Sequence, residues 1–84
     1  MSTDNRPLLI VAATIVDGEA SASQIGVDDV AIITPRSHAQ VGRIIRGVVM
    51  TPRFAALLEA NDRAASRVAS CARIDARKSG VGWG

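Results

Sequence analysis

Apolar and polar positions in the first part of the chain fall into short blocks that predict β-strands. The block from Leu8 to Val16 contains Ile, Val and Thr without helical spacing and ends at Asp17-Gly18. Such a run predicts a central strand, buried on both faces and followed by a turn. Residues 19–27 are small and polar, so we expect a loop or an irregular strand there. The block from Val30 to Thr34 predicts a second short strand, which Pro35 stops.

The spacing changes to a helical one in the middle of the chain. Ser37 is a candidate helix N-cap, since Gln40 three residues later completes a capping box. Over residues 38–49 the apolar side chains gather on one face of a helical wheel, whereas a strand would require apolar and polar residues to alternate. Two glycines and several β-branched residues lower the helix propensity of this stretch. We therefore predict a short helix, and a strand is the alternative.

The clearest pattern predicts a long amphipathic helix that begins after Thr51. Thr51 is the expected N-cap, and Pro52 takes the first helical position, where its missing N–H is not needed. An apolar stripe follows on one side and polar residues line the other. The stripe is Phe54, Leu57, Leu58, Ala64, Ala65, Val68, Ala69 and Ala72, and the polar residues are Glu59, Arg63, Ser66, Arg67, Ser70 and Arg77. The pattern breaks where Ile74 falls on the polar side and Asp75 on the apolar side. Either the helix ends near Arg73, or its last turns face a different neighbour.

Together these elements predict one α/β domain of the α+β type. It has two short strands, then a short helix and a long C-terminal helix packed across the strands. The 84 residues divide into a polar arm (1–6), a strand region (7–34), a helical region (37–79) and a flexible Gly/Trp tail (80–84). A chain this short buries only about 60–65% of its unfolded surface. Its core is also poor in aromatic residues, with only Phe54 and Trp83, which favours association with other chains.

Few residues of the chain suit catalysis or metal binding. The single cysteine, Cys71, excludes an internal disulfide. With the single histidine, His38, it makes no zinc or iron site, because such sites need about four clustered ligands. The sequence also lacks a serine or cysteine paired with a base and an orienting third residue. We therefore expect a non-enzymatic protein with no cofactor and no bound metal.

The apolar run from Pro7 to Val16 bears on localisation. It is too short to span a bilayer. The acidic residues around it argue against a secretory signal. We expect no membrane contact, no secretion, and a location in a virion or the bacterial cytoplasm.

Charge is distributed unevenly along the chain. Residues 1–34 hold one basic and five acidic side chains, a net charge of −4, and residues 35–84 hold nine basic and three acidic ones, a net charge of +6. This polarity suits head-to-tail packing of one copy's acidic half on another's basic half. It equally suits a basic face turned toward phosphate or an acidic protein. Glu59 precedes Arg63 by four residues, the spacing of an ion pair within one helix.

Seven residues of the second half are candidate partner-binding residues. Arginine and lysine on the last helix suit contacts with carboxylates or phosphates. A solvated helix face is the simpler interpretation of the same charges. A tryptophan in a glycine-rich terminus is typical of an interface anchor, although it also suits a side chain folded back on its own core. The candidates are Arg63, Arg67, Arg73, Ile74, Arg77, Lys78 and Trp83.

The segment from Val41 to Gly80 resembles the helical portion of the neck proteins that join head to tail in long-tailed bacteriophages. In both, a hydrophobic stretch leads through a small loop into a long helix rich in alanine and arginine. A glycine-containing turn follows, here Lys78-Ser79-Gly80. The neck proteins continue into strands after the turn, whereas the predicted strands here precede the helix, so another small virion subunit fits equally. The resemblance implies a structural subunit of a ring or lattice.

Three function hypotheses follow from the sequence. The first is a structural or assembly subunit, such as a neck or minor capsid protein of a bacteriophage, that forms a homo-oligomer or joins a larger protein assembly. The second is a small basic DNA-binding or regulatory dimer, since a short helix, a turn at 50–52 and a second helix resemble a helix-turn-helix. The third is an adaptor that binds one host protein through Trp83.

Overall fold

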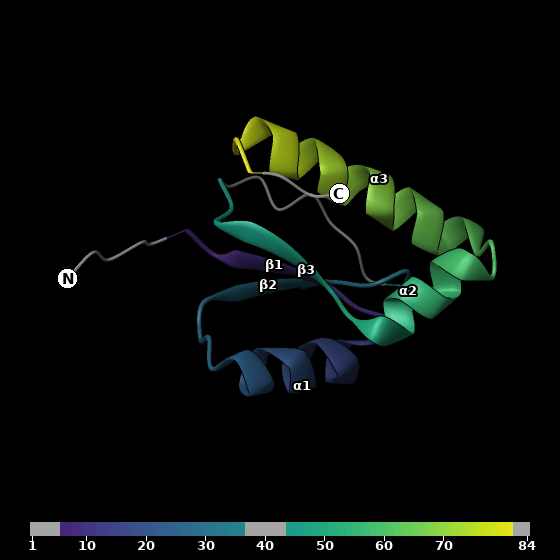
Figure 1. Ribbon diagram of the computed structural model, residues 1–84, viewed down its shortest axis with the longest axis horizontal. Helices are drawn as coiled ribbons and strands as arrows, with labels where there is room; N and C mark the ends of the chain where they lie inside the picture. Colours follow the sequence, from purple (N-terminus) through teal and green to yellow (C-terminus); the bar gives the residue numbers. More distant parts are fainter. Residues whose placement is uncertain (1–5, 37–43, 82–84) are drawn as a thin grey trace.

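A computed structural model describes residues 6–36 and 44–81 of the chain. In these ranges three parallel strands form one sheet in the order β2-β1-β3, with helices on both faces (Figure 1). The predicted mixed α/β class is confirmed. The α+β type is wrong, because all three strands are parallel and helices cover both faces of the sheet. One helix and one strand were not predicted. The strands are β1 (Leu8–Val11), β2 (Val30–Ile33) and β3 (Gly47–Met50). The helices are α1 (Ile15–Ile25), α2 (Pro52–Glu59) and α3 (Arg63–Lys78).

Strand β1 lies between the other two strands, as its run of apolar residues predicted. It pairs in parallel with β2, Leu8 opposite Val30, and with β3, Leu8 opposite Gly47. Successive side chains of a strand point to opposite faces of the sheet. Leu9 therefore packs in the core beneath α3, and Ile10 packs in the core beneath α1. Both are fully buried, which explains why neither face of β1 carries a polar residue.

Helix α1 replaces the end of the predicted first strand and the predicted loop. The chain leaves the sheet after Val11, and Thr14 caps α1 by accepting a hydrogen bond from the Asp17 N–H at 3.1 Å. The strand prediction is therefore wrong for residues 12–16, and the Asp17-Gly18 turn is wrong as well. Gly18 allows α1 to lie close to the sheet, because a Cβ at this position would stand 2.5 Å from Cγ2 of Ile32.

Strand β3 lies where the sequence predicted the end of a short helix. Residues 38–43 of that predicted helix, and its predicted N-cap Ser37, are outside the described part of the chain. Residues 44–46 are not helical and Gly47–Met50 is a strand, so the helix prediction is wrong for residues 44–49. A run such as Val48-Val49-Met50 has no periodicity that separates helix from strand. Pairing with β1 decides between the two, since it satisfies the backbone groups of the inner edge of β3.

Thr51 caps α2 as predicted, accepting a hydrogen bond from the Phe54 N–H at 3.2 Å, and Pro52 takes the first turn. The predicted single long helix, however, is two helices. Asn61 adopts a left-handed conformation with φ of 60°, which ends α2. Asp62 then caps α3 by accepting a hydrogen bond from the Ala65 N–H at 2.9 Å.

The break changes which side chains meet. Ala64, predicted in the apolar stripe, is exposed because α3 begins a new register. Glu59 and Arg63 belong to different helices, and no ion pair joins these two described residues. The rest of the predicted stripe is buried or half-buried against the sheet.

The sheet divides the apolar core into two parts. The larger part lies under α2 and α3 and contains Phe54 and Val68, both fully buried. The smaller part lies under α1 and is built on Ile10, Ala12 and Ala22. Since α1 and α3 cover opposite faces of the sheet (Figure 1), their outer sides form opposite surfaces of the molecule.

Candidate functional site

The carboxyl edge of the sheet is the first place to look for a site, because open parallel sheets bind ligands there, where neighbouring strands lead to opposite faces. Strand β1 leads to α1 on one face, and β3 leads to α2 on the other. Between them the Thr51 hydroxyl donates a hydrogen bond to the Asp17 carboxylate, with 2.6 Å from Oγ1 to Oδ2. The same carboxylate oxygen accepts a hydrogen bond from the Ala13 N–H at 3.2 Å.

The polar groups at this edge are engaged with one another. The Asp17 carboxylate occupies the first turn of α1, where the helix dipole favours a negative charge. The Thr51 hydroxyl also caps α2, and Thr34, which follows β2, is buried and interacts with another group of the structure. The carboxyl edge therefore holds the two helical layers together through the bond between Asp17 and Thr51.

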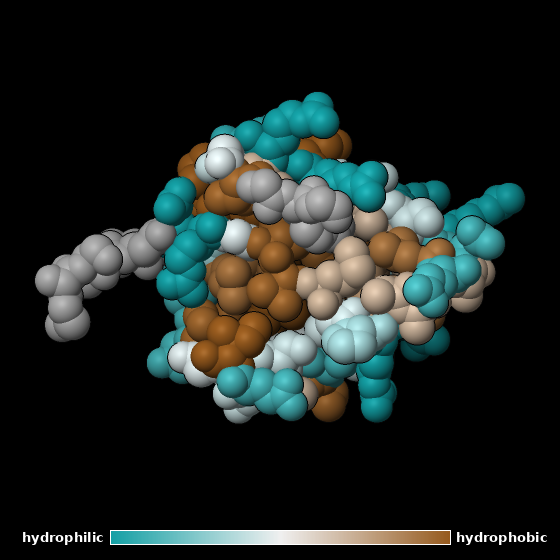
Figure 2. All heavy atoms as spheres, viewed as in Figure 1, coloured by the Kyte–Doolittle hydropathy of each residue, from teal (hydrophilic) through white to brown (hydrophobic). Residues whose placement is uncertain are grey.

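The outward side of α3 is the second candidate, and we call it the α3 outer face. It consists of the exposed residues Arg63, Arg67, Ser70, Arg73, Ile74, Arg77 and Lys78. The opposite side of the helix packs on the sheet through Ala65, Val68, Ala69, Ala72, Asp75 and Ala76. In Figure 2, hydrophilic side chains line α3, whereas hydrophobic ones gather over β3 between α3 and α1.

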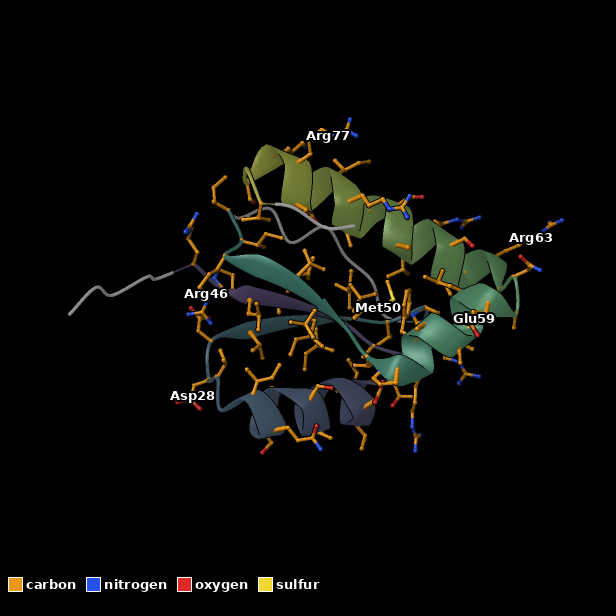
Figure 3. All side chains as sticks on the ribbon, in the orientation of Figure 1. Asp28, Arg46, Met50, Glu59, Arg63 and Arg77 are labelled. Atoms are coloured by element: carbon orange, nitrogen blue, oxygen red, sulfur yellow. The ribbon has the colours of Figure 1, made fainter. Side chains whose placement is uncertain are left out.

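The α3 outer face carries charge of one sign. Five of its seven residues are cationic, and the only carboxylate of α3, Asp75, lies on the buried side with 8% exposure. Arg77 and Lys78 lie in the last turn, where the helix dipole favours positive charge. In Figure 3, Arg77 points away from the sheet and Arg63 extends outward at the other end of α3. Arg73 also interacts with another group of the structure.

Ile74 interrupts this charged face with an apolar side chain that is 50% exposed. Ser70 precedes it by one turn and Lys78 follows it by one turn on the same side of the helix. The predicted failure of the amphipathic register at Ile74 and Asp75 is confirmed. The helix continues to Lys78, however, so of the two alternatives the one in which it ends near Arg73 is wrong.

Six of the seven candidate residues from the sequence thus lie together on the α3 outer face. The seventh, Trp83, lies outside the described residues. A second surface was missed, because the sequence predicted no helix at α1. Its signals were Thr14 and Asp17 at capping-box spacing, and Gly26, which ends α1 with φ of 80°.

The missed surface is a shallow hollow of about 330 Å³ between the C-terminal half of α1, the turn after it and β2. We call it the α1 hollow. It is lined by Glu19, Ala22, Ser23, Gly26, Val27, Asp28, Val30 and Ile32. Both charged residues of this lining are carboxylates, and both are exposed. The last turn of α1 also contains no basic residue to offset the negative end of its dipole.

Other chemistry is limited in the described part of the chain. No group of three or more His, Cys, Asp or Glu side chains there is placed to hold a metal ion. None of the helices in these ranges is both long and apolar enough to cross a membrane. Cys71 carries a free thiol and is half-buried on α3.

Comparison of the chain with protein-family models, with curated proteins and with solved structures gives no match. The resemblance to bacteriophage neck proteins therefore stays a prediction. The α3 outer face and the α1 hollow are the two candidate binding surfaces of the described residues.

Proposed function

We propose that this protein is a non-enzymatic structural subunit that assembles through protein–protein contacts of the α3 outer face. We further propose that it is a small component of a bacteriophage particle, such as a neck or minor capsid protein. The observation that carries the proposal is the position of Ile74, half-exposed among five cations. Protein interfaces combine an apolar centre with a polar rim and are enriched in arginine.

The composition of α3 supports an assembled state. Its buried side contributes one valine and four alanines to the core, so the helix buries little apolar volume for its length. A small domain with such a core gains stability by association. A partner that covers Ile74 would add apolar burial without changing the fold.

The carboxyl edge of the sheet supports a role without catalysis. Catalytic sites need groups that are free to meet a substrate. The Asp17 carboxylate and the Thr51 hydroxyl at this edge are instead hydrogen-bonded to each other and to backbone N–H groups. Their arrangement stabilises the junction of two helical layers.

The proposal is tested by the molar mass of the protein across a dilution series, measured by light scattering or sedimentation. We expect the wild-type protein to form oligomers that dissociate on dilution. Ile74→Ser should raise the dissociation constant about tenfold, since burial of the exposed half of an isoleucine contributes about 1–1.5 kcal/mol. Ile44→Ser is the matched control, because Ile44 is 51% exposed and lies outside α3. A wild-type protein that stays monomeric at every concentration, or two variants with the same effect, would contradict the proposal.

A second candidate is a small DNA-binding protein, favoured by the lack of any carboxylate on the α3 outer face. The helix-turn-helix that the sequence predicted is not its basis, since β3 lies where the first of those helices was expected. Five cations along about 24 Å of helix instead suit phosphates without base readout.

Duplex DNA affinity at several salt concentrations separates the two candidates. If four or five cations each meet a phosphate, log K should fall with log salt at a slope of about −4. A monomeric protein whose DNA affinity falls with salt at that slope supports DNA binding and contradicts the assembly proposal. An oligomer that does not bind duplex DNA, and whose mass stays the same when duplex is added, supports assembly.

A further inference from the structure

The α1 hollow and the α3 outer face have opposite charge. The hollow is rimmed by Glu19 and Asp28, and α1 contributes no cation to it. The α3 outer face holds five cations and no carboxylate. In Figure 3, Asp28 lies on the side of α1 and Arg77 on the side of α3, with the sheet between them. One molecule therefore cannot bring the two surfaces together, but two copies of the chain can.

The two surfaces also match in their apolar parts. The floor of the α1 hollow is formed by small or branched aliphatic side chains, among them Ala22, Val30 and Ile32, the last two only half-buried. On the α3 outer face, Ile74 is the one large apolar residue, and it is half-exposed. The hollow thus presents an apolar floor within an acidic rim, and the helix presents an apolar side chain within a basic rim.

We propose that Ile74 of one copy of this chain inserts into the α1 hollow of a second copy. Arg67 and Arg77 of the first copy then meet Glu19 and Asp28 of the second. The guanidinium groups also approach the C-terminal end of α1, whose dipole attracts positive charge. The inference rests on the proposed function, because it names the partner of the α3 outer face as another copy of the chain.

The contact is of the head-to-tail kind. The α1 hollow and the α3 outer face belong to helices on opposite faces of the sheet (Figure 1), so every copy can bind two neighbours. A contact between two different surfaces of the same chain generates a ring when the rotation closes and a filament when it does not. It does not generate a two-fold dimer, in which the same surface patch of both copies would meet, and the test below relies on this difference.

The test uses two charge-reversed variants and their mixture. One variant carries Arg67→Glu and Arg77→Glu, and the other carries Glu19→Arg and Asp28→Arg. In each variant the two pairs of residues that the contact brings together have like charge, so each variant should remain monomeric where the wild-type protein assembles. In an equimolar mixture every contact again joins opposite charges, so the mixture should regain the mass of the wild-type assembly in sedimentation velocity. The matched control is Arg36→Glu with Arg53→Glu, two exposed residues outside both surfaces, which should assemble like the wild type.

The outcomes separate this inference from the proposed function. If the wild type assembles and both charge-reversed variants assemble equally well, the inference is overturned while the proposed function stands. If both variants are folded by circular dichroism and their mixture stays monomeric, the inference is overturned as well. A wild-type protein that remains monomeric at millimolar concentration overturns both.

A charge-neutral variant provides a second route. Ser23→Phe places a large side chain in the α1 hollow at an exposed position, where it leaves the core untouched. We expect it to raise the dissociation constant of assembly at least tenfold. Val16→Phe is its control, because Val16 is 74% exposed on α1 and outside the lining of the hollow. Equal assembly of the two variants would overturn the inference even if a charge-reversed variant failed to fold.

Discussion

The hydrogen bond between Thr51 and Asp17 joins the two helical layers, and replacement of Thr51 by valine tests its role. Thr51 is 1% exposed, so the isosteric Thr51→Val change creates neither a cavity nor a new exposed surface. It removes a hydroxyl that donates to Asp17 at 2.6 Å and accepts from the Phe54 N–H at 3.2 Å. The change therefore removes two hydrogen bonds and little else.

The expected loss of stability follows from these two hydrogen bonds. Loss of a helix N-cap costs about 1 kcal/mol. Loss of a hydrogen bond to a charged group costs about 1.5–3 kcal/mol. Asp17 is only half-buried and keeps its bond to the Ala13 N–H, so water can partly replace the lost hydroxyl. We therefore expect Thr51→Val to lower the free energy of unfolding by about 2–3 kcal/mol.

Urea unfolding followed by circular dichroism measures this loss, with Thr51→Ser as the control. Serine keeps the hydroxyl and loses one methyl group, which costs about 1 kcal/mol. A double-mutant cycle of Thr51→Val with Asp17→Ala isolates the bond itself and should give a coupling energy of at least about 1 kcal/mol. The reasoning is refuted if valine costs no more than serine, or if the two single changes add to within about 0.5 kcal/mol.

Three further substitutions test the packing and the turns. Gly18→Ala should destabilise the protein by about 1–2 kcal/mol despite the better helix propensity of alanine, because its Cβ meets Ile32 at 2.5 Å; a raised melting temperature would contradict this. The Ile45 N–H donates a hydrogen bond to Ser79 Oγ at 2.9 Å. Ser79→Ala should therefore lower the free energy of unfolding in urea by about 1–3 kcal/mol and speed hydrogen exchange of the Ile45 N–H. Unchanged exchange at Ile45 would show that another group satisfies this N–H. Asn61→Gly should raise the free energy of unfolding by about 0.5–1 kcal/mol, since glycine adopts the left-handed φ of 60° without strain, and a lower melting temperature would be inconsistent with the turn described.

The sequence was most informative where a local signal and the fold agree. Thr51 and Pro52 fix the start of α2 through groups within one turn, so the prediction needed no knowledge of the rest of the chain. The apolar runs of β1 and β2 likewise predicted strands, although β1 ends at Val11 rather than at Val16, and β2, at the edge of the sheet, is mostly half-buried. The exposed position of Ile74 also followed from helical spacing alone.

The errors arose where long-range pairing decides the structure. Gly47–Met50 carries a run that suits a helix or a strand, and only its pairing with β1 selects the strand. Thr14 and Asp17 carry a capping signal that the apolar run around them concealed. The sequence shows the acidic charge of the first half, but without α1 it does not predict the α1 hollow. The sequence thus predicts the α3 outer face of the proposed contact, whereas the α1 hollow that faces it is found only in the folded structure.

The measurement that tests the central claim most directly is a dilution series followed by the backbone amide chemical shifts of the protein in NMR. At concentrations where monomers and small oligomers exchange, a head-to-tail contact should move the shifts of α3 around Ile74. It should also move those around the α1 hollow, from Glu19 to Asp28, with a single dissociation constant for both sets. Shifts confined to the edge of β3, or to α3 alone, would contradict the account. Chemical shifts that do not depend on protein concentration, and that change only when duplex DNA is added, would also contradict it.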